Sequence, residues 1–313
     1  MKVVILGGGE SGVGAAILAK TKGLEVFLSD KGEIKENYKK VLVENGIEFE
    51  EKNHDEERIL AADWVIKSPG VPKKAEMVQK IKAKGIRLSS EIEFGAEFTN
   101  AKIIAITGSN GKTTTTSLIY HILKNDNLNV GLGGNIGKSF AMQVAQENFD
   151  YYVLEVSSFQ LDDIQNFRPY ISLLLNLSPD HLDQYNYNYE EYALAKFRIA
   201  ENQENDNYFI YNKDDEMSQK LLQELDLRVK QIPFSMKEKL EEGGYTEEEK
   251  IVVKLHDEFS MKIEDLSLMG THNVANSLAA SIAGKLLNIS NESIRNSLMT
   301  FQAVEHRLEG VAE

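Results

Sequence analysis

Short runs of apolar residues alternate along the first third of the chain with segments in which apolar positions recur at helical spacing. The apolar runs are residues 3–6, 24–28 and 63–67, and helical patterns occur at 13–19 and around 77–81. Strands that are buried on both faces of a parallel sheet show such runs, and the helices between them return the chain across the sheet. The pattern predicts βαβ units, with ligands bound by loops at the carboxyl edge of the sheet.

The alternation restarts near residue 101, where an apolar strand is expected at 102–106. Further strands are expected at 128–132, 151–155, 171–175, 207–211 and 251–255, and helices near 138–146, 189–203, 214–224 and 271–287. The charged, Gly-containing stretch 237–250 predicts an exposed excursion. The fold class is therefore α/β, with a Rossmann-like N-terminal domain at 1–97 and a second α/β domain at 98–302.

Residues 105–116 form an apolar strand end, a Gly-rich turn, a lysine, a run of threonines and the start of a helical pattern. Glycines let backbone N–H groups close around phosphates, Lys112 can reach the outer phosphates, and the Thr113 hydroxyl suits Mg²⁺. Ile106 occupies the place of the usual first glycine, and Gly108 supplies the flexibility instead. The alternative is a plain Gly-rich turn with an exposed lysine. The order of the parts favours a P-loop-type ATPase domain that uses ATP or GTP.

An earlier glycine set follows the first predicted strand. Gly7, Gly9 and Gly12 have the spacing of a dinucleotide-binding turn, and Asp30 lies about 20 positions further on, as a ribose hydroxyl requires. Taken alone, this set predicts an NAD site. A second nucleotide site a hundred residues later, without a constellation for hydride transfer, argues against an NAD enzyme. The glycines could also serve only the close packing of helix on strand.

Three polar residues beyond the P-loop are candidates for chemistry. Glu155 ends a buried strand, where a carboxylate beside a triphosphate would bind Mg²⁺, although an ion pair would also satisfy it. His181 follows another strand and could be a general base, a metal ligand or a turn residue. Lys196 lies in an amphipathic helix, where a lysine is commonly solvated.

A later helix offers amide groups for a nucleotide. Thr271 is its expected N-cap, and Asn273 and Asn276 are three residues apart, so they share one helix face. Amides on one face suit a base edge or a ribose.

Composition narrows the class of protein. The chain has 313 residues with a formal net charge of -14, so a nucleic-acid partner is not expected. It has no cysteine, which excludes disulfides and Cys-ligated zinc. The N-terminus does not resemble a signal peptide, and no apolar stretch reaches the roughly 18 residues of a membrane span. The expected location is the cytoplasm, with no membrane partner.

Together these motifs resemble the Mur ligases, the cytoplasmic amino-acid-adding enzymes of peptidoglycan synthesis. The matching segments, in the family's order, are residues 107–113, 134–137, 155–161, 176–183, Lys196, 270–276 and 305–307. The Ser-Ser-Phe-Gln-Leu sequence at 157–161 and the short glycine-rich first domain resemble the D-glutamate-adding branch. The resemblance covers the whole chain.

The resemblance implies a role for each matched residue. The ATP phosphates would be held by Gly108, Asn110, Gly111, Lys112, Thr113 and Thr114, and the rest of the nucleotide by Asn273, Asn276 and Arg307. One Mg²⁺ would lie on Thr113 and Glu155, and a second among Glu155, His181 and a carbamylated Lys196. The catalytic residues would be Lys112, Glu155, His181 and Lys196. UDP would be held by Glu10, Ser11, Asp30 and Gly70, and the muramoyl-alanine end by Asn135, Ser157 and His181.

The implied reaction adds D-glutamate to UDP-N-acetylmuramoyl-L-alanine. ATP would phosphorylate the alanyl carboxylate, and the amine of D-glutamate would attack the acyl phosphate. We expect a monomer. Family members carry a third domain, which binds the incoming amino acid, so residues 303–313 would begin a linker to an absent domain and the chain would turn over little or nothing.

Two rival functions remain open. A folylpolyglutamate synthase-like ligase uses the same ATP chemistry, but such enzymes begin essentially at the ATP domain. A non-catalytic nucleotide-binding module would require Glu155, His181 and Lys196 to be coincidental.

Overall fold

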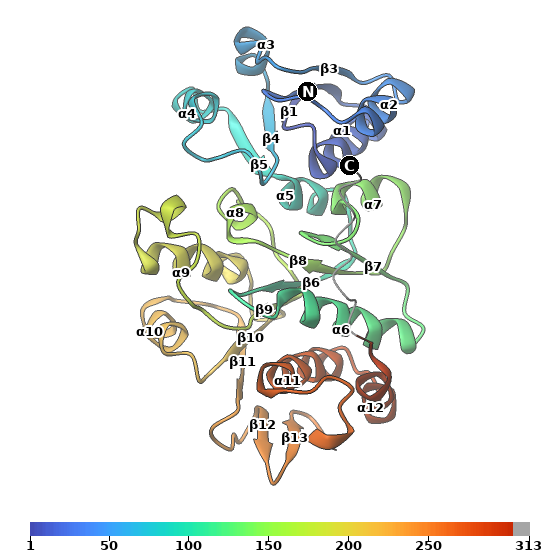
Figure 1. The fold of residues 1–313 in the computed structure, drawn as a ribbon, viewed down its shortest axis with the longest axis vertical. Coiled ribbons are helices and arrows are strands. Elements are labelled where there is room, and N and C mark those ends of the chain that lie inside the picture. Colours follow the sequence, from blue (N-terminus) through green and yellow to red (C-terminus); the bar gives the residue numbers. More distant parts are fainter. Residues whose placement is uncertain (303–313) are drawn as a thin grey trace, which may run out of the picture. The chain divides into compact units, whose positions relative to one another are not determined.

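The computed structural model describes residues 1–302, which divide into two compact units (Figure 1). The first unit contains Met1–Ala101 together with Gly133–Phe149 and Val156–Phe167. The second contains Lys102–Leu132, Asp150–Glu155 and the chain from Arg168 onward. The expected domain boundary near residue 98 and the expected linker stay predictions, and 303–313 lie outside the described residues.

The first unit is built on a five-stranded sheet in the order β3-β2-β1-β4-β5, and all neighbouring strands are parallel. Its strands are β1 (Lys2–Leu6), β2 (Glu25–Ser29), β3 (Glu48–Glu50), β4 (Trp64–Lys67) and β5 (Arg87–Ser90). Its helices are α1 (Glu10–Thr21), α2 (Glu36–Glu44), α3 (Glu56–Leu60), α4 (Glu76–Ala83), α5 (Glu91–Ala96), α7 (Phe140–Gln146) and α8 (Ser158–Leu161). The strand order reverses between β1 and β4, which is where open α/β sheets bind ligands.

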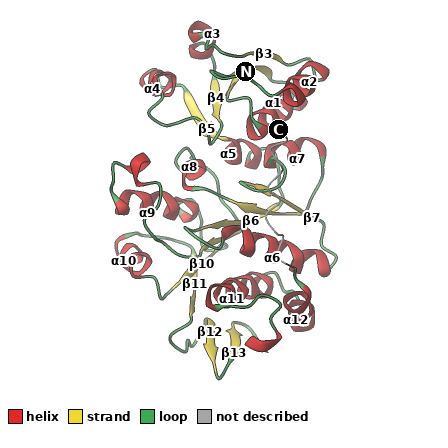
Figure 2. Cartoon of the chain, in the orientation of Figure 1, coloured by secondary structure: helices red, strands yellow, loops and turns green. Residues whose placement is uncertain are grey.

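Helices cover both faces of this sheet (Figure 2). On one face, Ile5 and Trp64 pack with residues of α1, α2, α5 and α7. On the other face, Val65 packs with Ile81 of α4 and with α3. Because successive strand residues point to opposite faces, apolar runs such as residues 3–6 supply both cores. The first unit is a three-layer α/β fold.

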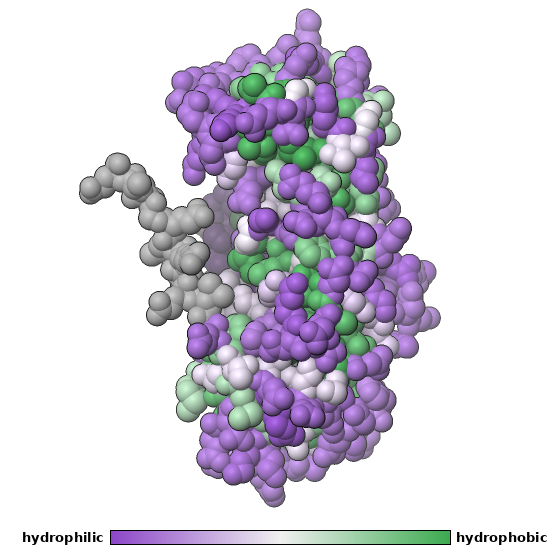
Figure 3. All heavy atoms as spheres, turned by 90° about the vertical axis from the view of Figure 1, so that its right-hand side faces the viewer, coloured by the Kyte–Doolittle hydropathy of each residue, from purple (hydrophilic) through white to green (hydrophobic). Residues whose placement is uncertain are grey.

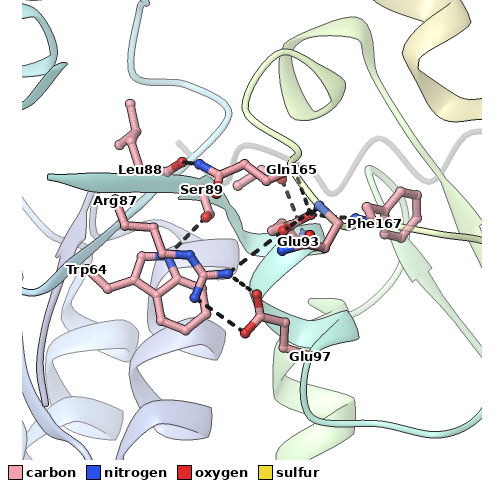
Figure 4. A network of polar contacts seen from close by, with 10 residues as sticks. Trp64, Arg87, Leu88, Ser89, Glu93, Glu97, Gln165 and Phe167 are labelled. Atoms are coloured by element: carbon pink, nitrogen blue, oxygen red, sulfur yellow. Dashed lines mark hydrogen bonds and ion pairs between the residues drawn. The ribbon is translucent and has the colours of Figure 1, made fainter. Parts of the chain in front are cut away.

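Two segments of the first unit come from far along the sequence and are held by buried carboxylates of α5. Glu91 accepts hydrogen bonds from Ser139 Oγ and from the backbone N–H of Ala141 at 2.6 and 2.7 Å. Glu93 accepts from the backbone N–H groups of Gln165 and Phe167 at 3.2 and 2.8 Å (Figure 4). We call residues 133–149 and 156–167 the first and second excursions. These hydrogen bonds tie both excursions to the first unit.

The second unit is built on a nine-stranded sheet in the order β14-β13-β12-β11-β10-β9-β6-β8-β7. The strands are β6 (Lys102–Thr107), β7 (Val130–Gly134), β8 (Tyr151–Glu155), β9 (Ile171–Leu174), β10 (Tyr208–Asn212), β11 (Lys230–Ser235), β12 (Gly243–Glu247), β13 (Lys250–Lys254) and β14 (Glu258–Lys262). The helices are α6 (Lys112–Asn125), α9 (Tyr189–Phe197), α10 (Glu216–Glu224), α11 (Thr271–Leu286) and α12 (Asn291–Thr300), with 3₁₀ turns η1 (Leu182–Tyr185), η2 (Arg198–Ala200) and η3 (Ile263–Asp265). β6 pairs in parallel with β8 and β9, whereas β12, β13 and β14 are antiparallel.

A large apolar core lies between this sheet and α6, α11 and α12. Ile104 and Ile106 of β6 contribute to it together with Ile119 of α6 and Leu278 of α11, and all four are essentially inaccessible to solvent. β6 is thereby fixed between β9 and β8, with the turn that follows it at the carboxyl edge. The predicted α/β class is confirmed in both units.

The expectation of an exposed excursion at 237–250 is wrong. Residues 243–247 form β12, which pairs with β11 and β13, and Tyr245 packs with Leu240 and Val252 in a small buried cluster. Gly244 is buried because α11 packs directly on it, and a side chain there would come within 2.8 Å of Ile282. Exposed charged residues at 237–239 and 248–250 flank β12, so the sequence pattern of this region resembles that of an exposed loop.

Polar side chains cover much of the face drawn in Figure 3. Large apolar side chains exposed in the described part of the chain include Tyr187 and Met269, which are separate in sequence. Over residues 1–302, none of the helices combines the length and the hydropathy required to cross a bilayer.

Candidate functional site

The turn after β6 has the backbone of a phosphate-binding loop. Gly108 and Gly111 both have positive φ angles, 151° and 83°, which residues with a Cβ rarely adopt. Gly111 immediately precedes α6, and a side chain there would come within 2.5 Å of Asn276 Oδ1. The loop therefore needs glycine at 111 for its conformation and for the close approach of Asn276.

Lys112 folds back over this loop. Its ammonium group donates to the carbonyl oxygens of Gly108 and Ser109 at 2.8 and 2.9 Å. Burial lowers the pKa of Lys112, and the nearby charges of Glu155 and Asp180 oppose that effect. The interpretation as a plain turn with an exposed lysine is wrong, because the lysine is half-buried against the loop.

Thr113 and Glu155 meet at the carboxyl edge of the sheet. The Thr113 hydroxyl donates to Glu155 Oε2 at 2.7 Å, and Glu155 is only 3% exposed at the end of β8. β8 pairs with β6 in parallel, so both strands deliver their ends to the same edge. A hydroxyl and a carboxylate oxygen are ligands that Mg²⁺ prefers, so this pair fits one Mg²⁺ beside a triphosphate.

The loop after β9 braces the phosphate-binding loop. The Asn176 side chain accepts from Asn110 N at 2.9 Å and donates to Asn110 O at 3.0 Å. Ser109 Oγ donates to Ser178 O at 3.0 Å and accepts from Ser178 N at 2.9 Å, and Tyr192 OH of α9 lies 3.1 Å away. Sequence reasoning missed Tyr192, because its contact with Ser109 spans 83 residues and carries no motif.

Lys196 and His181 lie in contrasting environments. Lys196 is 2% exposed, and its ammonium group donates to Gly108 O at 2.9 Å and lies 4.8 Å from the centroid of the Tyr192 ring. The solvated-lysine alternative is therefore wrong. The His181 side chain is exposed, and its Nε2 lies 3.5 Å from Asp180 Oδ2. Its backbone is left-handed, with φ of 48°, at the start of η1.

No cluster of three or more His, Asp or Glu side chains suited to a metal occurs among residues 1–302. The expected second Mg²⁺ would therefore depend on Lys196 in its carbamylated form, together with Glu155 and His181. Carbamylation of Lys196 stays a prediction.

Of the two asparagines of α11, Asn276 lies against the phosphate-binding loop, and Asn273 is hydrogen-bonded to Asn276. Asn276 is buried beside Gly111, and its amide donates to Asn273 Oδ1 at 3.4 Å. Thr271 is not the N-cap as expected, because Gly270 takes that place with φ of 96° and Thr271 is the first helical residue. Arg307 lies outside the described residues.

The first unit contains a cavity of about 580 Å³ at the carboxyl ends of β1, β2 and β4. Five expected substrate residues line it, namely Glu10, Ser11, Asp30, Gly70 and Asn135. Lining residues that the sequence did not assign to the substrate include His54, Ser68, Val71 and Pro72. Their nearness to the glycine turn follows from strand order, which a single sequence does not display.

Asp30 and the glycines shape this cavity. The Asp30 carboxylate accepts from Gly8 N and, at 2.7 Å, from Gly32 N, so it joins the loops after β1 and β2. A side chain at Gly12 would lie 1.8 Å from Gly7 O, so Gly12 serves close packing of α1 on the loop. Nothing lies within 4 Å of a side chain placed at Gly9, which leaves space there for a ligand.

Two expected substrate residues lie outside this cavity. Ser157 caps α8, where its hydroxyl accepts from Gln160 N and the Gln160 side chain accepts from Ser157 N in return. His181 belongs to the second unit. Their expected contacts with substrate stay predictions.

Comparison with known proteins identifies two family domains along the chain. A family model of the Mur ligase middle domain matches residues 106–284, and one of the MurD N-terminal domain matches residues 2–77. The chain is 53% identical over 311 residues to the UDP-N-acetylmuramoylalanine–D-glutamate ligase of Christiangramia forsetii, covering 99% of this chain and 70% of the relative. It is 51% identical to the ligase of the same name from Bacteroides fragilis, with the same coverage.

Solved structures share the fold at lower identity. A UDP-N-acetylmuramate:L-alanyl-gamma-D-glutamyl-meso-diaminopimelate ligase from Neisseria meningitides matches 97% of this chain and 99% of its own, with a TM-score of 0.67 and 20% identity. The UDP-N-acetylmuramate-alanine ligase from Thermotoga maritima matches 98% of this chain and 70% of its own, with a TM-score of 0.59 and 21% identity. At these identities the likeness concerns the fold.

Proposed function

The chain belongs to the Mur ligase family, and we propose that it serves the ATP-dependent addition of D-glutamate to UDP-N-acetylmuramoyl-L-alanine in peptidoglycan precursor synthesis. The observation that carries the proposal is the 53% identity to a D-glutamate-adding ligase across 99% of the chain. It is supported by a glycine loop and a Thr113–Glu155 pair in one unit and a cavity in the other.

ATP would bind at the loop after β6. The residues proposed to hold its phosphates are Gly108, Asn110, Gly111, Lys112, Thr113 and Thr114, with Asn273, Asn276 and Arg307 on the rest of the nucleotide. Lys112 would exchange the carbonyls that it now contacts for phosphate oxygens. Mg²⁺ on Thr113 and Glu155 would neutralise the charge that develops on the phosphates.

The proposed reaction has two steps, formation of an acyl phosphate and its attack by an amine. An oxygen of the alanyl carboxylate attacks the γ-phosphorus of ATP, and the bond to ADP breaks to give an acyl phosphate. The amine of D-glutamate then attacks the acyl carbon, inorganic phosphate leaves, and the amine loses a proton. Positioning and charge stabilisation do most of this work, so the braced loop and buried Glu155 matter more than any nucleophile of the protein.

Lys196 and His181 are proposed to act near the substrate carboxylate. An unmodified ammonium at Lys196 would repel a metal ion, whereas a carbamylated Lys196 would attract one. We propose this modification and a second Mg²⁺ at Glu155, His181 and Lys196.

The cavity of the first unit is proposed to hold the UDP end of the substrate. N–H groups of the Gly7–Gly12 turn and Lys31 can face the diphosphate, and Asp30 and Glu10 can face hydroxyl or imide groups. The muramoyl-alanine end is assigned to Asn135, Ser157 and His181. We propose a cytoplasmic location, because ATP and UDP-linked precursors are cytoplasmic compounds. We also propose that the protein is a monomer.

Calorimetric titration of this chain with UDP-N-acetylmuramoyl-L-alanine, with NAD as control, tests the proposal. We expect saturable binding of the UDP compound and none of NAD. A folylpolyglutamate synthase-like ligase would fail to bind the UDP compound, and preferential binding of NAD would overturn the assignment of the first unit. In a separate titration, Lys112→Ala should bind Mg²⁺ and ATP about 10- to 100-fold more weakly than the parent chain.

A further inference from the structure

The first excursion contributes one residue to the lining of the first-unit cavity. Asn135 lines the cavity, whereas the chain around it comes from the end of β7. Gly133 and Lys138 pair as an isolated β-bridge, and Gln143 Nε2 donates to Lys138 O at 3.1 Å. The bridge joins the two ends of the loop that carries Asn135, so we expect the position of this loop to depend on Ser139, the N-cap of α7.

The start of α7 is held by carboxylates from two other helices. Glu91 of α5 accepts from Ser139 Oγ at 2.6 Å and from Ala141 N at 2.7 Å. Glu10 of α1, which itself lines the cavity, accepts from Ser139 N at 3.2 Å. Ser139 also packs closely on Gly14 of α1, where a side chain would lie 2.0 Å from Ser139 Oγ.

Stability alone does not explain the choice of glutamate at 91. Its side chain is 1% exposed, and its Oε2 has no hydrogen-bond partner within the described residues. Burial raises the pKa of the Glu91 carboxyl to about 7, although the hydrogen bonds from Ser139 and Ala141 lower it in part. Burying a carboxyl group with one unpaired oxygen costs free energy that an apolar residue would avoid.

We propose that Glu91 is a positioning residue for the UDP-linked substrate, because it fixes Ser139 and thereby sets Asn135 in the cavity wall. The inference rests on the proposed function of this cavity. Glu91 itself does not line the cavity, so its effect on binding must pass through the first excursion.

The test is a double-mutant cycle in calorimetric binding of UDP-N-acetylmuramoyl-L-alanine to this chain. Glu91→Ala should weaken binding about tenfold, the equivalent of one lost hydrogen bond to substrate, and Asn135→Ala should do the same. The double variant should bind no more weakly than the weaker single variant, because both changes remove one contact. Glu91→Gln should stay within about threefold of the parent, since an amide oxygen can accept both hydrogen bonds.

Ser89→Ala on β5 is the matched control. It removes the partner of Trp64 Nε1, which donates to Ser89 Oγ at 2.9 Å, so it destabilises the same unit without touching the cavity lining. The melting temperature of Ser89→Ala should be lower than that of the parent chain, and its affinity for the substrate should be unchanged. If Glu91→Ala fails to fold, Ser139→Ala replaces it in the cycle, with an expected loss of about threefold or more.

Three results separate the inference from the function on which it rests. Absence of binding by the parent chain contradicts the proposed function. Binding by the parent with unchanged affinity in Glu91→Ala, or with fully additive losses in the double variant, overturns the positioning role alone. A loss of substrate affinity in Ser89→Ala equal to that in Glu91→Ala would also overturn the positioning role, because general destabilisation of the unit would then explain both losses.

Discussion

Lys112 is held by the loop that it is proposed to serve. Two backbone carbonyls accept from its ammonium group, so the charge is satisfied before any phosphate arrives. Phosphate oxygens carry full negative charge and should displace these neutral acceptors, because charge-assisted hydrogen bonds are about twice as strong as neutral ones. The ammonium group of Lys112 therefore already lies beside the proposed phosphate site.

The first prediction concerns this lysine. Lys112→Ala should weaken binding of Mg²⁺ and ATP by about 10- to 100-fold, since hydrogen bonds to charged groups contribute about 1.5–3 kcal/mol. Isothermal titration measures the effect. Lys124→Ala, on the last turn of the same helix and exposed, is the control and should leave the affinity unchanged. Equal affinities for Lys112→Ala and the parent would contradict the role.

The second prediction concerns the titration of Glu91. Its pKa rises from 4.5 to about 7 on folding because burial disfavours the charged form, so the folded state holds a proton that the unfolded state has lost between these pH values. The free energy of unfolding should therefore fall by about 3 kcal/mol as the pH rises from 4.5 to 7. In Glu91→Gln this part of the slope should be absent. Urea titrations of both chains across the window give the difference, and parallel curves would contradict the assignment.

At the scale of elements, α5 links distant segments through two buried glutamates with different bonding. Both oxygens of Glu93 accept backbone N–H groups of residues 165–167, and Arg87 lies beside them, stacked on Trp64 (Figure 4). Glu91, in contrast, uses one oxygen for both of its hydrogen bonds. Replacing Glu by Gln should therefore change the free energy of unfolding by different amounts at positions 91 and 93.

The third prediction compares these glutamates directly. Glu93→Gln replaces an acceptor by an N–H₂ group opposite backbone donors and should lower the free energy of unfolding by about 2–4 kcal/mol. Glu91→Gln retains its acceptor and avoids the buried charge, so it should be near neutral at pH 4.5 and should raise the free energy of unfolding by about 3 kcal/mol at pH 8. The midpoints of urea unfolding measured side by side test this ordering. Similar shifts for both variants would show that burial alone, and not the bonding pattern, decides the cost.

The same scale shows what the sequence could predict. Strands buried on both faces, such as β1 and β9, are apolar runs and were located from the pattern. β5 was missed because its Ser89 and Ser90 are polar, one bonded to Trp64 Nε1 and the other capping α5. β11 was missed because it contains Pro233. Polar or proline-containing strands depend on tertiary partners that local periodicity does not report.

The residues of the candidate sites also differ in whether the sequence could predict them. The phosphate-binding loop and Thr113 were found because their residues are contiguous and their spacing has a mechanism. Glu155 was placed beside them because parallel strands end at one edge. Tyr192 contacts Ser109 across 83 residues, and Glu91 contacts Ser139 and Ala141 across 48 and 50 residues. No motif marks such contacts.

At the scale of the whole chain, the cavity proposed for UDP and the loop proposed for the ATP phosphates are each built within one unit. The residues lining the cavity all belong to the first unit, whereas Lys112, Thr113, Glu155 and the residues bonded to them belong to the second. Ligands bound one at a time should then be recognised independently, because changes without shared partners add to within a few tenths of a kcal/mol.

The fourth prediction follows from this division. Lys112→Ala should leave the affinity for UDP-N-acetylmuramoyl-L-alanine within about twofold of the parent in the absence of ATP, and Asn135→Ala should leave the affinity for ATP equally unchanged. Each variant serves as the folding control for the other, since it must still bind the ligand of its intact unit. A change of tenfold or more at the untouched site would mean that the two units communicate in the unliganded chain, and the sites would then have to be treated as one coupled system.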